Sequence, residues 1–196
     1  MQRQVILNAL ITIWDSEQEA PISCHPERNN ITLAKRKRDW DQIEQCLMPE
    51  YSHADVIKND FGQPSLLDGK FLSISHSDRF AATAISIEPV GIDIQVPRTT
   101  IFKVRHKFCH PNELQFLSNH DEDQRYHMIW CAKEAIFKIY GFGIDFSRDL
   151  FCYSFDAHTQ RIEYHQQSPN HKKAILEVEF IKKHHYFVAI AKIKKT

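Results

Sequence analysis

The sequence predicts an α+β fold of two halves that meet near residues 95 to 100. Short runs rich in β-branched and aromatic residues, separated by turn-forming positions, predict antiparallel strands in both parts of the chain. One long stretch with apolar residues at helical spacing, and a less regular one before it, predict helices that cover those strands. We therefore assign residues 1–97 to an N-terminal half and residues 98–196 to a C-terminal half.

The N-terminal half begins with a predicted strand from Val5 to Trp14, followed by a helical stretch that starts at Thr32. The apolar positions of this stretch recur at roughly helical spacing: Leu33, Trp40, Ile43 and Leu47. Gly62, Pro64 and Gly69 then indicate a loop. The runs after the loop predict a small antiparallel meander of three strands: residues 71–75, 80–86 and 90–94.

The C-terminal half begins with a helical zone between Pro97 and Pro111, and Pro111 suits the first turn of a further helix. The strongest helical pattern of the chain runs from Asp121 to Tyr140 and is followed by Gly141 and Gly143. Four more runs predict the strands that complete this half: residues 150–155, 161–165, 174–180 and 186–193.

The composition is that of an ordinary globular protein, with 42% apolar and 26% charged residues. The longest apolar N-terminal stretch is interrupted by Asn8 and Thr12, so it indicates neither a membrane span nor a signal peptide. Basic and acidic residues are equal in number, whereas a protein that binds along DNA is usually basic. The five scattered cysteines argue for reduced thiols. We therefore expect a cytoplasmic protein with neither a nucleic-acid nor a membrane partner.

An acid, Asp93, lies on the last strand of the predicted meander. Val90, Ile92 and Ile94 share one face of this strand. Asp93 and Gln95 project from the other face, about 6 to 7 Å apart. An aspartate on the solvent face of an edge strand is the ordinary outcome of such a pattern. The strand therefore becomes informative only together with a second motif.

The long helix carries an acid between two lysines. Its core-facing stripe is spaced three, four and three residues apart: Ile129, Ala132, Ile136 and Ile139. An adjoining flank combines aromatic and charged residues: Trp130, Lys133, Glu134, Phe137 and Lys138. One interpretation is a solvated flank on which Glu134 and Lys138 form a surface pair worth about 0.2 to 0.5 kcal/mol. A cleft wall is the other, because large aromatic side chains usually pack against a partner surface.

If Asp93 and Glu134 converge, these carboxylates and the amide of Gln95 would form a hard oxygen site suited to Mg²⁺. Lys133 and Lys138 would then neutralise phosphate oxygens. In phosphoryl transfer a metal ion polarises the phosphate, and lysines offset the developing negative charge. The two motifs together therefore point to phosphoryl-type transfer.

These segments resemble the marks of the 4'-phosphopantetheinyl transferase superfamily. Gly91 to Gln95 is similar to its Gly-(Ile/Val)-Asp-(Ile/Val)-Glu strand, and Trp130 to Lys138 to its Trp-x-x-Lys-Glu-(Ala/Ser)-x-x-Lys helix. Ser75 to Ser77 resembles the family's Ser-His-Ser segment, and Phe61 to Pro64 resembles a weaker Gly-Lys-Pro element. The resemblance implies two similar α+β halves in a pseudo-two-fold arrangement, each an antiparallel sheet packed with helices. It also implies a monomer, as in the branch that activates surfactin synthetase.

The resemblance further implies an activity. Members of the family move the 4'-phosphopantetheine arm of coenzyme A to a serine of an acyl or peptidyl carrier protein and release adenosine 3',5'-bisphosphate. Such carriers are acidic, transient partners that serve fatty acid or secondary metabolite biosynthesis. By this resemblance Asp93 and Glu134 would ligate Mg²⁺, and Lys138 would contact the pyrophosphate. Ser75 and His76 would help to hold the phosphates of coenzyme A.

Other positions are assigned less directly. A basic run would meet the 3'-phosphate of coenzyme A or else form a solvated helix face: Lys35, Arg36, Lys37 and Arg38. Glu113 is a candidate base for the carrier serine. Gln95 stands where many relatives have a metal-binding glutamate, and Gln63 replaces the lysine of Gly-Lys-Pro. Two alternatives remain: a non-catalytic module that binds coenzyme A or a carrier, motivated by Gln95, and a Mg²⁺-dependent phosphohydrolase.

Overall fold

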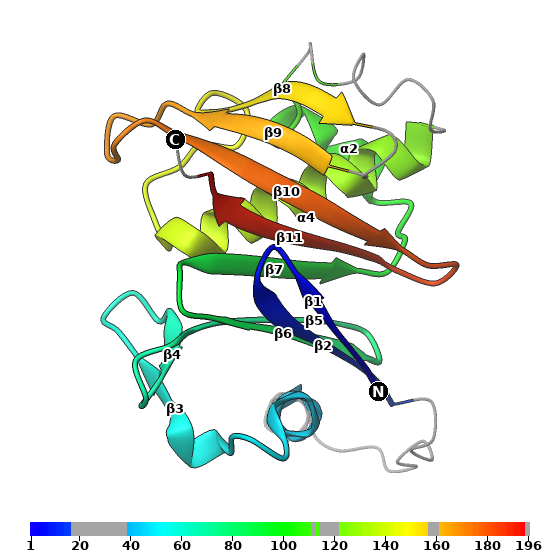
Figure 1. Cartoon of the computed structure of the whole chain (residues 1–196). Coiled ribbons are helices and arrows are strands. Elements are labelled where there is room, and N and C mark those ends of the chain that lie inside the picture. Colours follow the sequence, from blue (N-terminus) through cyan, green and yellow to red (C-terminus); the bar gives the residue numbers. More distant parts are fainter. Residues whose placement is uncertain (17–38, 111–112, 114–121, 157–160, 195–196) are drawn as a thin grey trace, which may run out of the picture.

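The computed structural model describes residues 1–16, 39–110, 113, 122–156 and 161–194. Its strands form two antiparallel sheets, which lie one above the other in Figure 1. The first sheet has the strand order β1-β2-β6-β5-β4-β3, and the second has the order β7-β11-β10-β9-β8. Because each sheet is accompanied by helical segments, the predicted α+β class is confirmed.

The first sheet consists of β1 (Gln2–Ile6), β2 (Ala9–Asp15), β3 (Val56–Lys58), β4 (Pro64–Leu66), β5 (Phe71–Ser77) and β6 (Phe80–Ser86). The second consists of β7 (Val90–Gln95), β8 (Leu150–Asp156), β9 (Arg161–Gln166), β10 (Ala174–Lys182) and β11 (Phe187–Ile193). The helices are η1 (His53–Asp55), α2 (Ile101–Val104), η2 (Arg105–Lys107) and α4 (Glu122–Tyr140), and residues 39–47 are also helical. The long helix and the last four strands therefore lie where the sequence predicted them.

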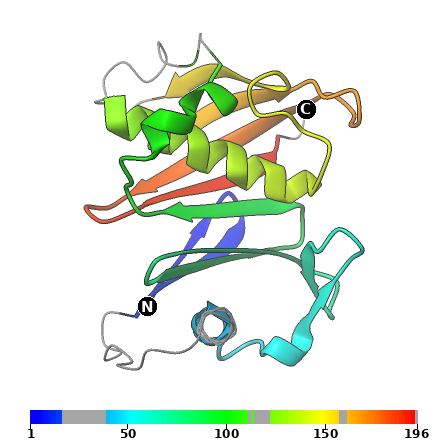
Figure 2. The ribbon, with the colours of Figure 1, turned by 180° about the vertical axis from the view of Figure 1, so that it is seen from behind.

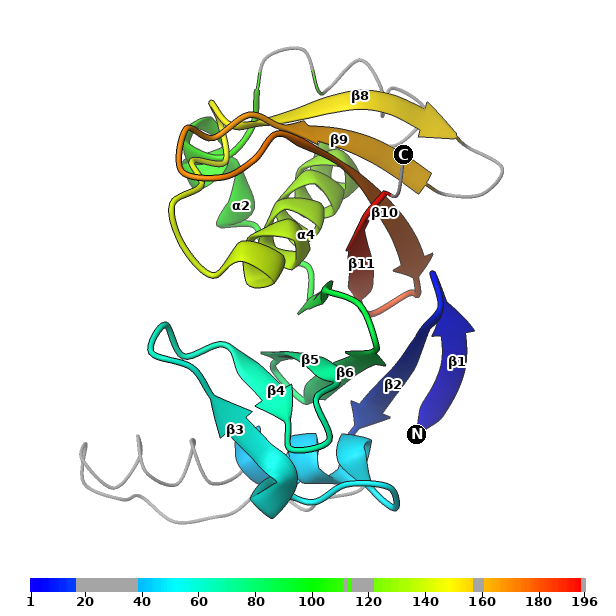
Figure 3. The same ribbon diagram turned by 60° about the vertical axis from the view of Figure 1, so that its left-hand side comes forward.

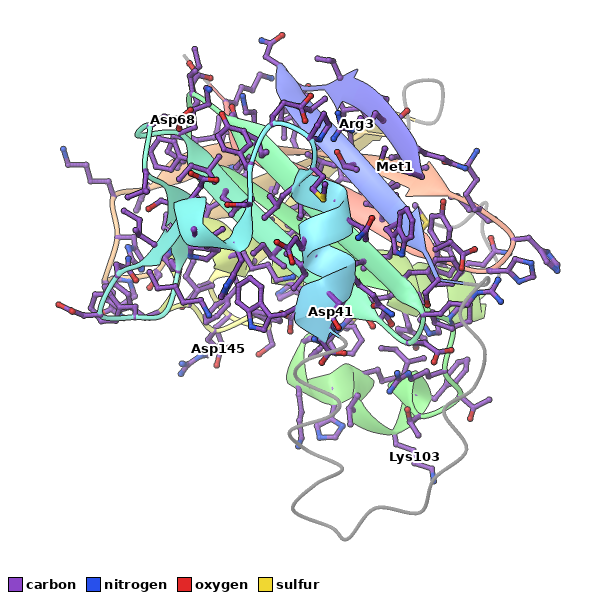
Figure 4. All side chains as sticks on the ribbon, turned by 90° about the horizontal axis from the view of Figure 1, so that it is seen from below. Met1, Arg3, Asp41, Asp68, Lys103 and Asp145 are labelled. Carbon is purple, nitrogen blue, oxygen red and sulfur yellow. The ribbon has the colours of Figure 1, made fainter. Side chains whose placement is uncertain are left out.

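The elements are stacked in four layers. Helix α4 covers the outer face of the second sheet (Figure 2), and the helical residues 39–47 cross the outer face of the first sheet (Figure 4, where Asp41 marks them). Between the sheets lies a core to which β2, β6, β7 and β11 contribute Ile11, Ala82, Ile92 and Ile190. No helix in the described part of the chain is both long and apolar enough to cross a membrane.

The single strand predicted from Val5 to Trp14 is instead a hairpin of β1 and β2. Leu7 and Asn8 form its turn, and both have positive φ angles, of 48° and 58°. Two-residue turns of this hand match the twist of the strands that they connect. Asparagine tolerates the conformation well, but leucine seldom adopts it, so the sequence carried only half of the usual turn signal.

The predicted three-stranded meander is also wrong. Strands β5 and β6 pair with each other, but β7 leaves the first sheet and pairs antiparallel with β11, with Asp93 opposite Ala189. The predicted N-terminal half therefore contains a strand that belongs to the second sheet. The change of sheet falls between Ser86 and Val90, whereas the division into residues 1–97 and 98–196 as domains stays a prediction.

Strand β7 is the edge strand of the second sheet that lies nearest the first sheet (Figure 1), and its other edge is bonded by serine side chains of β5. The hydroxyl oxygens of Ser73, Ser75 and Ser77 accept hydrogen bonds of 3.0, 3.1 and 3.0 Å. The donors are the backbone N–H groups of every second residue: Ile92, Ile94 and Val96. Because side chains alternate along a strand, a serine at every second position of β5 can serve every second N–H of β7. These bonds fix the position of β7 against β5.

One face of β7 packs closely against α4, and Gly91 makes this close contact possible. A Cβ atom at this position would overlap the backbone carbonyl oxygen of Ala135 in the middle of α4. Glycine therefore permits the strand and the helix to approach more closely than any other residue would allow. Two residues further on, Asp93 projects on the same side of β7 and so reaches the flank of the helix.

Candidate functional site

Asp93 is the centre of a small polar cluster formed by three elements. Its carboxylate Oδ1 accepts hydrogen bonds of 2.8 Å from Ser75 Oγ on β5 and of 2.8 Å from Lys138 Nζ on α4. Its Oδ2 accepts a bond of 2.9 Å from Gln95 Nε2. We call these four residues the Asp93 cluster. Asp93 is 3% exposed, and its charge is therefore stabilised by directed donors more than by bulk water.

The cluster depends on residues from distant parts of the chain. Lys138 also donates to the backbone oxygen of Ile92 at 2.9 Å, so its ammonium group bridges the backbone and the side chain of β7. Cys131, almost two turns earlier on α4, donates its thiol to the backbone oxygen of Asp93 at 3.2 Å. The side chain and the backbone of Asp93 are thus both bonded to α4.

Glu134 lies on α4 one turn before Lys138 and near Asp93. Burial raises the pKa of Glu134, the negative charge of Asp93 raises it further, and Lys138 acts in the opposite direction. The two acids predicted to converge are therefore close enough to interact electrostatically, with one ammonium group beside them. Within the described residues, however, no group of three or more His, Cys, Asp or Glu side chains is arranged to hold a metal ion.

A cavity of about 650 Å³ opens beside the Asp93 cluster. Its wall includes Ser75, His76, Asp93 and Lys138, and also Gly62 and Pro64 of the segment that resembles Gly-Lys-Pro. The other lining residues were not assigned a functional role from the sequence: Asp39, Trp40, Ile43, Lys58 and Ile74. We call it the main cavity. It lies where α4, β5, β7 and the β3–β4 hairpin come together, and Figure 3 shows α4 and β4 on the same side of the molecule.

The charged residues of the main cavity are mostly paired with neighbours on its wall. His76 Nε2 lies 3.2 Å from Asp39 Oδ2, and Lys58 Nζ lies 4.9 Å from the centre of the Trp40 ring. The cavity thus offers a flat aromatic ring and the ammonium groups of Lys58 and Lys138, features that suit an anionic ligand with a planar part. Lys58 gave no signal in the sequence, because the three-residue strand β3 is too short to show a pattern.

Lys133 does not reach the Asp93 cluster. Its side chain is completely buried on another side of α4, where Nζ lies 2.8 Å from both carboxylate oxygens of Glu113. Nζ also donates to the backbone oxygens of Phe108, Phe146 and Leu150, at 2.8, 2.6 and 3.2 Å. The sequence had placed Lys133 on one flank with Glu134 and Lys138, but consecutive helical residues point about 100° apart.

The aromatic residues of this flank pack against the protein itself. The Trp130 ring lies 5.1 Å from that of Phe108 and 5.8 Å from that of Phe146, and Phe137 lies 5.8 Å from Phe146. Their partner surface is thus formed by the segments before α4 and after it. The flank predicted as one cleft wall is divided, since Lys138 lines the main cavity whereas Trp130 and Lys133 pack among other residues.

Glu113 is 1% exposed and lies with Lys133, away from Asp93. Burial raises the pKa of the Glu113 carboxyl group and lowers the pKa of the Lys133 ammonium group, while their mutual attraction opposes both shifts. The geometry thus gives a buried ion pair rather than an acid at the cavity. The basic run at Lys35, Arg36, Lys37 and Arg38 lies outside the described residues.

Gln63, at the position expected for a lysine, bonds to α4 instead of facing a ligand. Its Nε2 donates to the backbone oxygens of Lys138 and Ile139, at 3.1 and 3.2 Å. Gln95 was expected to offer its amide oxygen to a metal ion beside Asp93. In the structure its amide nitrogen faces Asp93 and donates a hydrogen bond to the carboxylate. Both glutamines thus act within the protein as hydrogen-bond donors.

Comparison with known proteins is consistent with this geometry. The model of the 4'-phosphopantetheinyl transferase superfamily matches residues 89–191, which include β7 and α4. The 4'-phosphopantetheinyl transferase gsp of Aneurinibacillus migulanus is 34% identical over 90 residues, which are 44% of this chain and 38% of that protein. The 4'-phosphopantetheinyl transferase Sfp of Bacillus subtilis (strain 168) is 31% identical over 91 residues, which are 45% and 40%. The matched part is thus less than half of each relative's length.

Proposed function

The chain belongs to the 4'-phosphopantetheinyl transferase superfamily, and we propose that it transfers the 4'-phosphopantetheine arm of coenzyme A to a serine of an acyl or peptidyl carrier protein. In this reaction the serine hydroxyl releases its proton, its oxygen forms a bond to the phosphorus next to the pantetheine arm, and the pyrophosphate bond breaks. Adenosine 3',5'-bisphosphate leaves. We further propose that the reaction depends on Mg²⁺ and that the carrier is an acidic, transient partner.

The convergence of Asp93, Ser75 and Lys138 at the wall of the main cavity is the observation that carries this proposal. Residues separated by up to 63 positions meet there, although each belongs to a different element. Phosphoryl transfer needs little covalent chemistry from a protein, and it needs accurate placement of charges. A hydrogen-bonded cluster beside a cavity of about 650 Å³ supports that placement.

Asp93 and Glu134, the acid beside the Asp93 cluster, have the donor chemistry that suits Mg²⁺. Both groups are carboxylates, which Mg²⁺ prefers, and Asp93 and Glu134 raise the local negative charge beyond what Lys138 offsets. An ionised carboxylate offers about four acceptor positions, and the protein uses three of those on Asp93. We propose that Asp93 and Glu134 hold the ion, with Gln95 orienting Asp93 or reaching the ion through water. Bound Mg²⁺ would polarise the pyrophosphate and offset its charge.

The remaining residues would hold coenzyme A. We assign Lys138 to the pyrophosphate and Ser75 and His76 to the coenzyme A phosphates, since all three lie on the wall of the main cavity. The run from Lys35 to Arg38 directly precedes Asp39 of that wall, which supports its assignment to the 3'-phosphate. The burial of Glu113 against Lys133 gives no support to its role as the base for the carrier serine.

One copy of the chain supplies every residue of the Asp93 cluster. A site completed within one chain supports the proposal that the protein acts as a monomer. Light scattering of the purified protein should then give the mass of one chain, with and without coenzyme A.

The test is the mass of the carrier. With coenzyme A and Mg²⁺, the protein should add the phosphopantetheine arm to at least one member of a panel of apo carrier proteins. Asp93→Asn and Glu134→Gln should abolish this addition, because each removes a carboxylate without changing the shape of the side chain. Asp68→Ala is the matched control, since Asp68 is exposed in the turn before β5 (Figure 4), bonds to Tyr51 and Lys70, and is not among the residues that line the main cavity. Failure to modify any carrier would contradict the proposal.

Gln95 favours a second candidate, a module that binds coenzyme A or a carrier without turnover. The amide leaves Asp93 and Glu134 as the two carboxylates of the proposed ion site, which weakens that site relative to one with three acids. Tight binding of coenzyme A in calorimetry, with no transfer even at raised Mg²⁺, would favour this candidate over the transferase. Release of phosphate without any carrier would favour a phosphohydrolase.

A further inference from the structure

The last turn of α4 is capped by a side chain of the loop that precedes β4. A helix leaves its final carbonyl groups without partners inside the helix, and these groups need other donors. In α4, the carbonyl oxygens of Lys138 and Ile139 accept from Gln63 Nε2, at 3.1 and 3.2 Å. Gln63 directly precedes β4 of the first sheet. The end of the helix that carries Lys138 is therefore bonded to the loop that precedes β4.

The amide of Gln63 is itself held in one orientation. Its Oε1 accepts a hydrogen bond of 2.9 Å from Asn59 Nδ2. The Oδ1 atom of Asn59 accepts from the backbone N–H groups of Phe61 and Gln63, both at 3.0 Å. The backbone N–H of Gly62 donates to the backbone oxygen of Asn59 at 2.9 Å. The loop from Asn59 to Gln63 is thus closed by its own hydrogen bonds, with Nε2 directed at the helix.

Close packing joins the same two segments. Gly141 follows α4 with a φ of +81°, and a Cβ atom there would overlap the side-chain amide of Gln63. The rings of Phe61 and Phe142 are stacked, with their centres 4.5 Å apart. Both aromatic residues are largely exposed, at 61% and 43%, so their contact with each other removes part of their apolar surface from water. The loop and the residues after α4 therefore form a continuous contact.

Lys138 is consequently bonded at both of its ends. Its backbone oxygen accepts from Gln63, and its Nζ donates to Asp93 Oδ1 and to the backbone oxygen of Ile92. Gly62 and Pro64, the neighbours of Gln63, line the main cavity together with Lys138. Any fraying of the last turn of α4 would move the ammonium group away from Asp93, because one turn of an α-helix rises about 5.4 Å.

We propose that Gln63 is a positioning residue that holds the last turn of α4 so that Lys138 reaches Asp93 and a ligand in the main cavity. Only the kinetic consequence of this role rests on the proposed function; the structural role does not. Gln63 bonds to the backbone of Lys138 and is not among the residues that line the main cavity. A lysine at position 63 would bring a positive charge to the cavity. Gln63 instead bonds to the end of α4, the helix that carries Lys138.

The variant Gln63→Leu tests the proposal, because leucine fills a similar space and donates no hydrogen bond. Asn170→Ala is the matched control. The Nδ2 atom of Asn170 donates to the backbone oxygen of Gly143 at 3.0 Å, so it bonds the same segment a few residues beyond Lys138. Loss of both hydrogen bonds of Gln63 should speed amide hydrogen exchange at residues 139–142 roughly tenfold. Asn170→Ala should leave the exchange of these amides unchanged.

This measurement requires no activity, so it separates the inference from the proposed function. Unchanged exchange at residues 139–142 in Gln63→Leu would overturn the positioning role, even if the protein transfers phosphopantetheine. Faster exchange in a protein that modifies no carrier would leave the structural role standing while the transferase proposal fails.

For an active protein, the kinetic test is a double-mutant cycle with Lys138→Met. Gln63→Leu should lower kcat/KM for coenzyme A roughly tenfold in the wild type, and less than about twofold when Lys138 is already replaced. Such non-additivity is expected because Gln63 acts through Lys138. Independent losses that multiply in the double variant would show a general effect on the fold and would contradict the proposal.

Discussion

The two lysines of α4, Lys133 and Lys138, have opposite environments. The side chain of Lys133 is 0% exposed and donates to three backbone oxygens and to Glu113. The side chain of Lys138 is 25% exposed, donates to Asp93 and lines the main cavity. One lysine therefore connects the segments around the helix, whereas the other remains accessible to a ligand. The same residue type in one motif serves stability in the first case and a candidate site in the second.

The geometry of the helix explains this difference. Five residues advance the helix by about 140° beyond a full turn, so the two side chains leave α4 in different directions. One direction leads to residues 108–113 and 146–150, which surround Lys133. The other leads to β7, where Gly91 lets the helix approach and Asp93 presents its carboxylate. The partner surface, and not the motif, decides what each lysine does.

The largest effect that would test this contrast is on stability at Lys133. Lys133→Met should lower the free energy of unfolding by about 3 to 5 kcal/mol, because it leaves the carboxyl group of Glu113 buried without its ammonium partner. Urea unfolding measures this loss. The double variant Lys133→Met with Glu113→Leu removes both charges and should recover much of the stability. A loss under about 1 kcal/mol in Lys133→Met would show that the pair is not structural.

The second effect is on activity at Lys138. Lys138→Met should lower the rate of phosphopantetheine transfer roughly a hundredfold, since an aimed positive charge in a shielded site offsets charge that develops in the transition state. Its free energy of unfolding should fall by no more than about 1 to 2 kcal/mol, because Ser75 and Gln95 still bond to Asp93. A transfer assay and urea unfolding check the two parts. The contrast between the lysines fails if Lys138→Met unfolds as readily as Lys133→Met.

The smallest effect concerns the affinity of the Lys138 side of α4, next to Asp93 and Gln95, for Mg²⁺. Gln95→Glu should lower the Mg²⁺ concentration for half-maximal binding roughly tenfold, because it adds a third carboxylate beside Asp93 and Glu134. Without Mg²⁺ the variant should be less stable than the wild type by about 1 kcal/mol, since Asp93 loses a donor and gains a negative neighbour. Thermal unfolding at a series of Mg²⁺ concentrations measures both changes. Equal Mg²⁺ dependence in variant and wild type would show that residue 95 does not contribute to an ion site.

Local patterns predicted the elements that carry the site. The alternation of Val90, Ile92 and Ile94 correctly indicated a strand with Asp93 on its other face, and Ile129, Ala132 and Ile136 are buried as their spacing predicted. These features depend on the repeat of a strand or a helix, which is a property of neighbouring residues. The turn at Leu7 and Asn8 was missed because the conformation of a leucine there depends on the hairpin around it.

The sequence by itself thus determined the α+β class, the identity of β7 and α4, and the presence of an acid on each of them. Only the tertiary structure decided that β7 joins β11 rather than β6, that Ser75 and Lys138 meet at Asp93, and that Lys133 is buried with Glu113. It also decided that Gln63 caps α4. Each of these outcomes is a contact between residues that lie far apart in the chain. Periodicity specifies which face of an element is apolar, but the partner of a polar side chain is chosen when the elements pack.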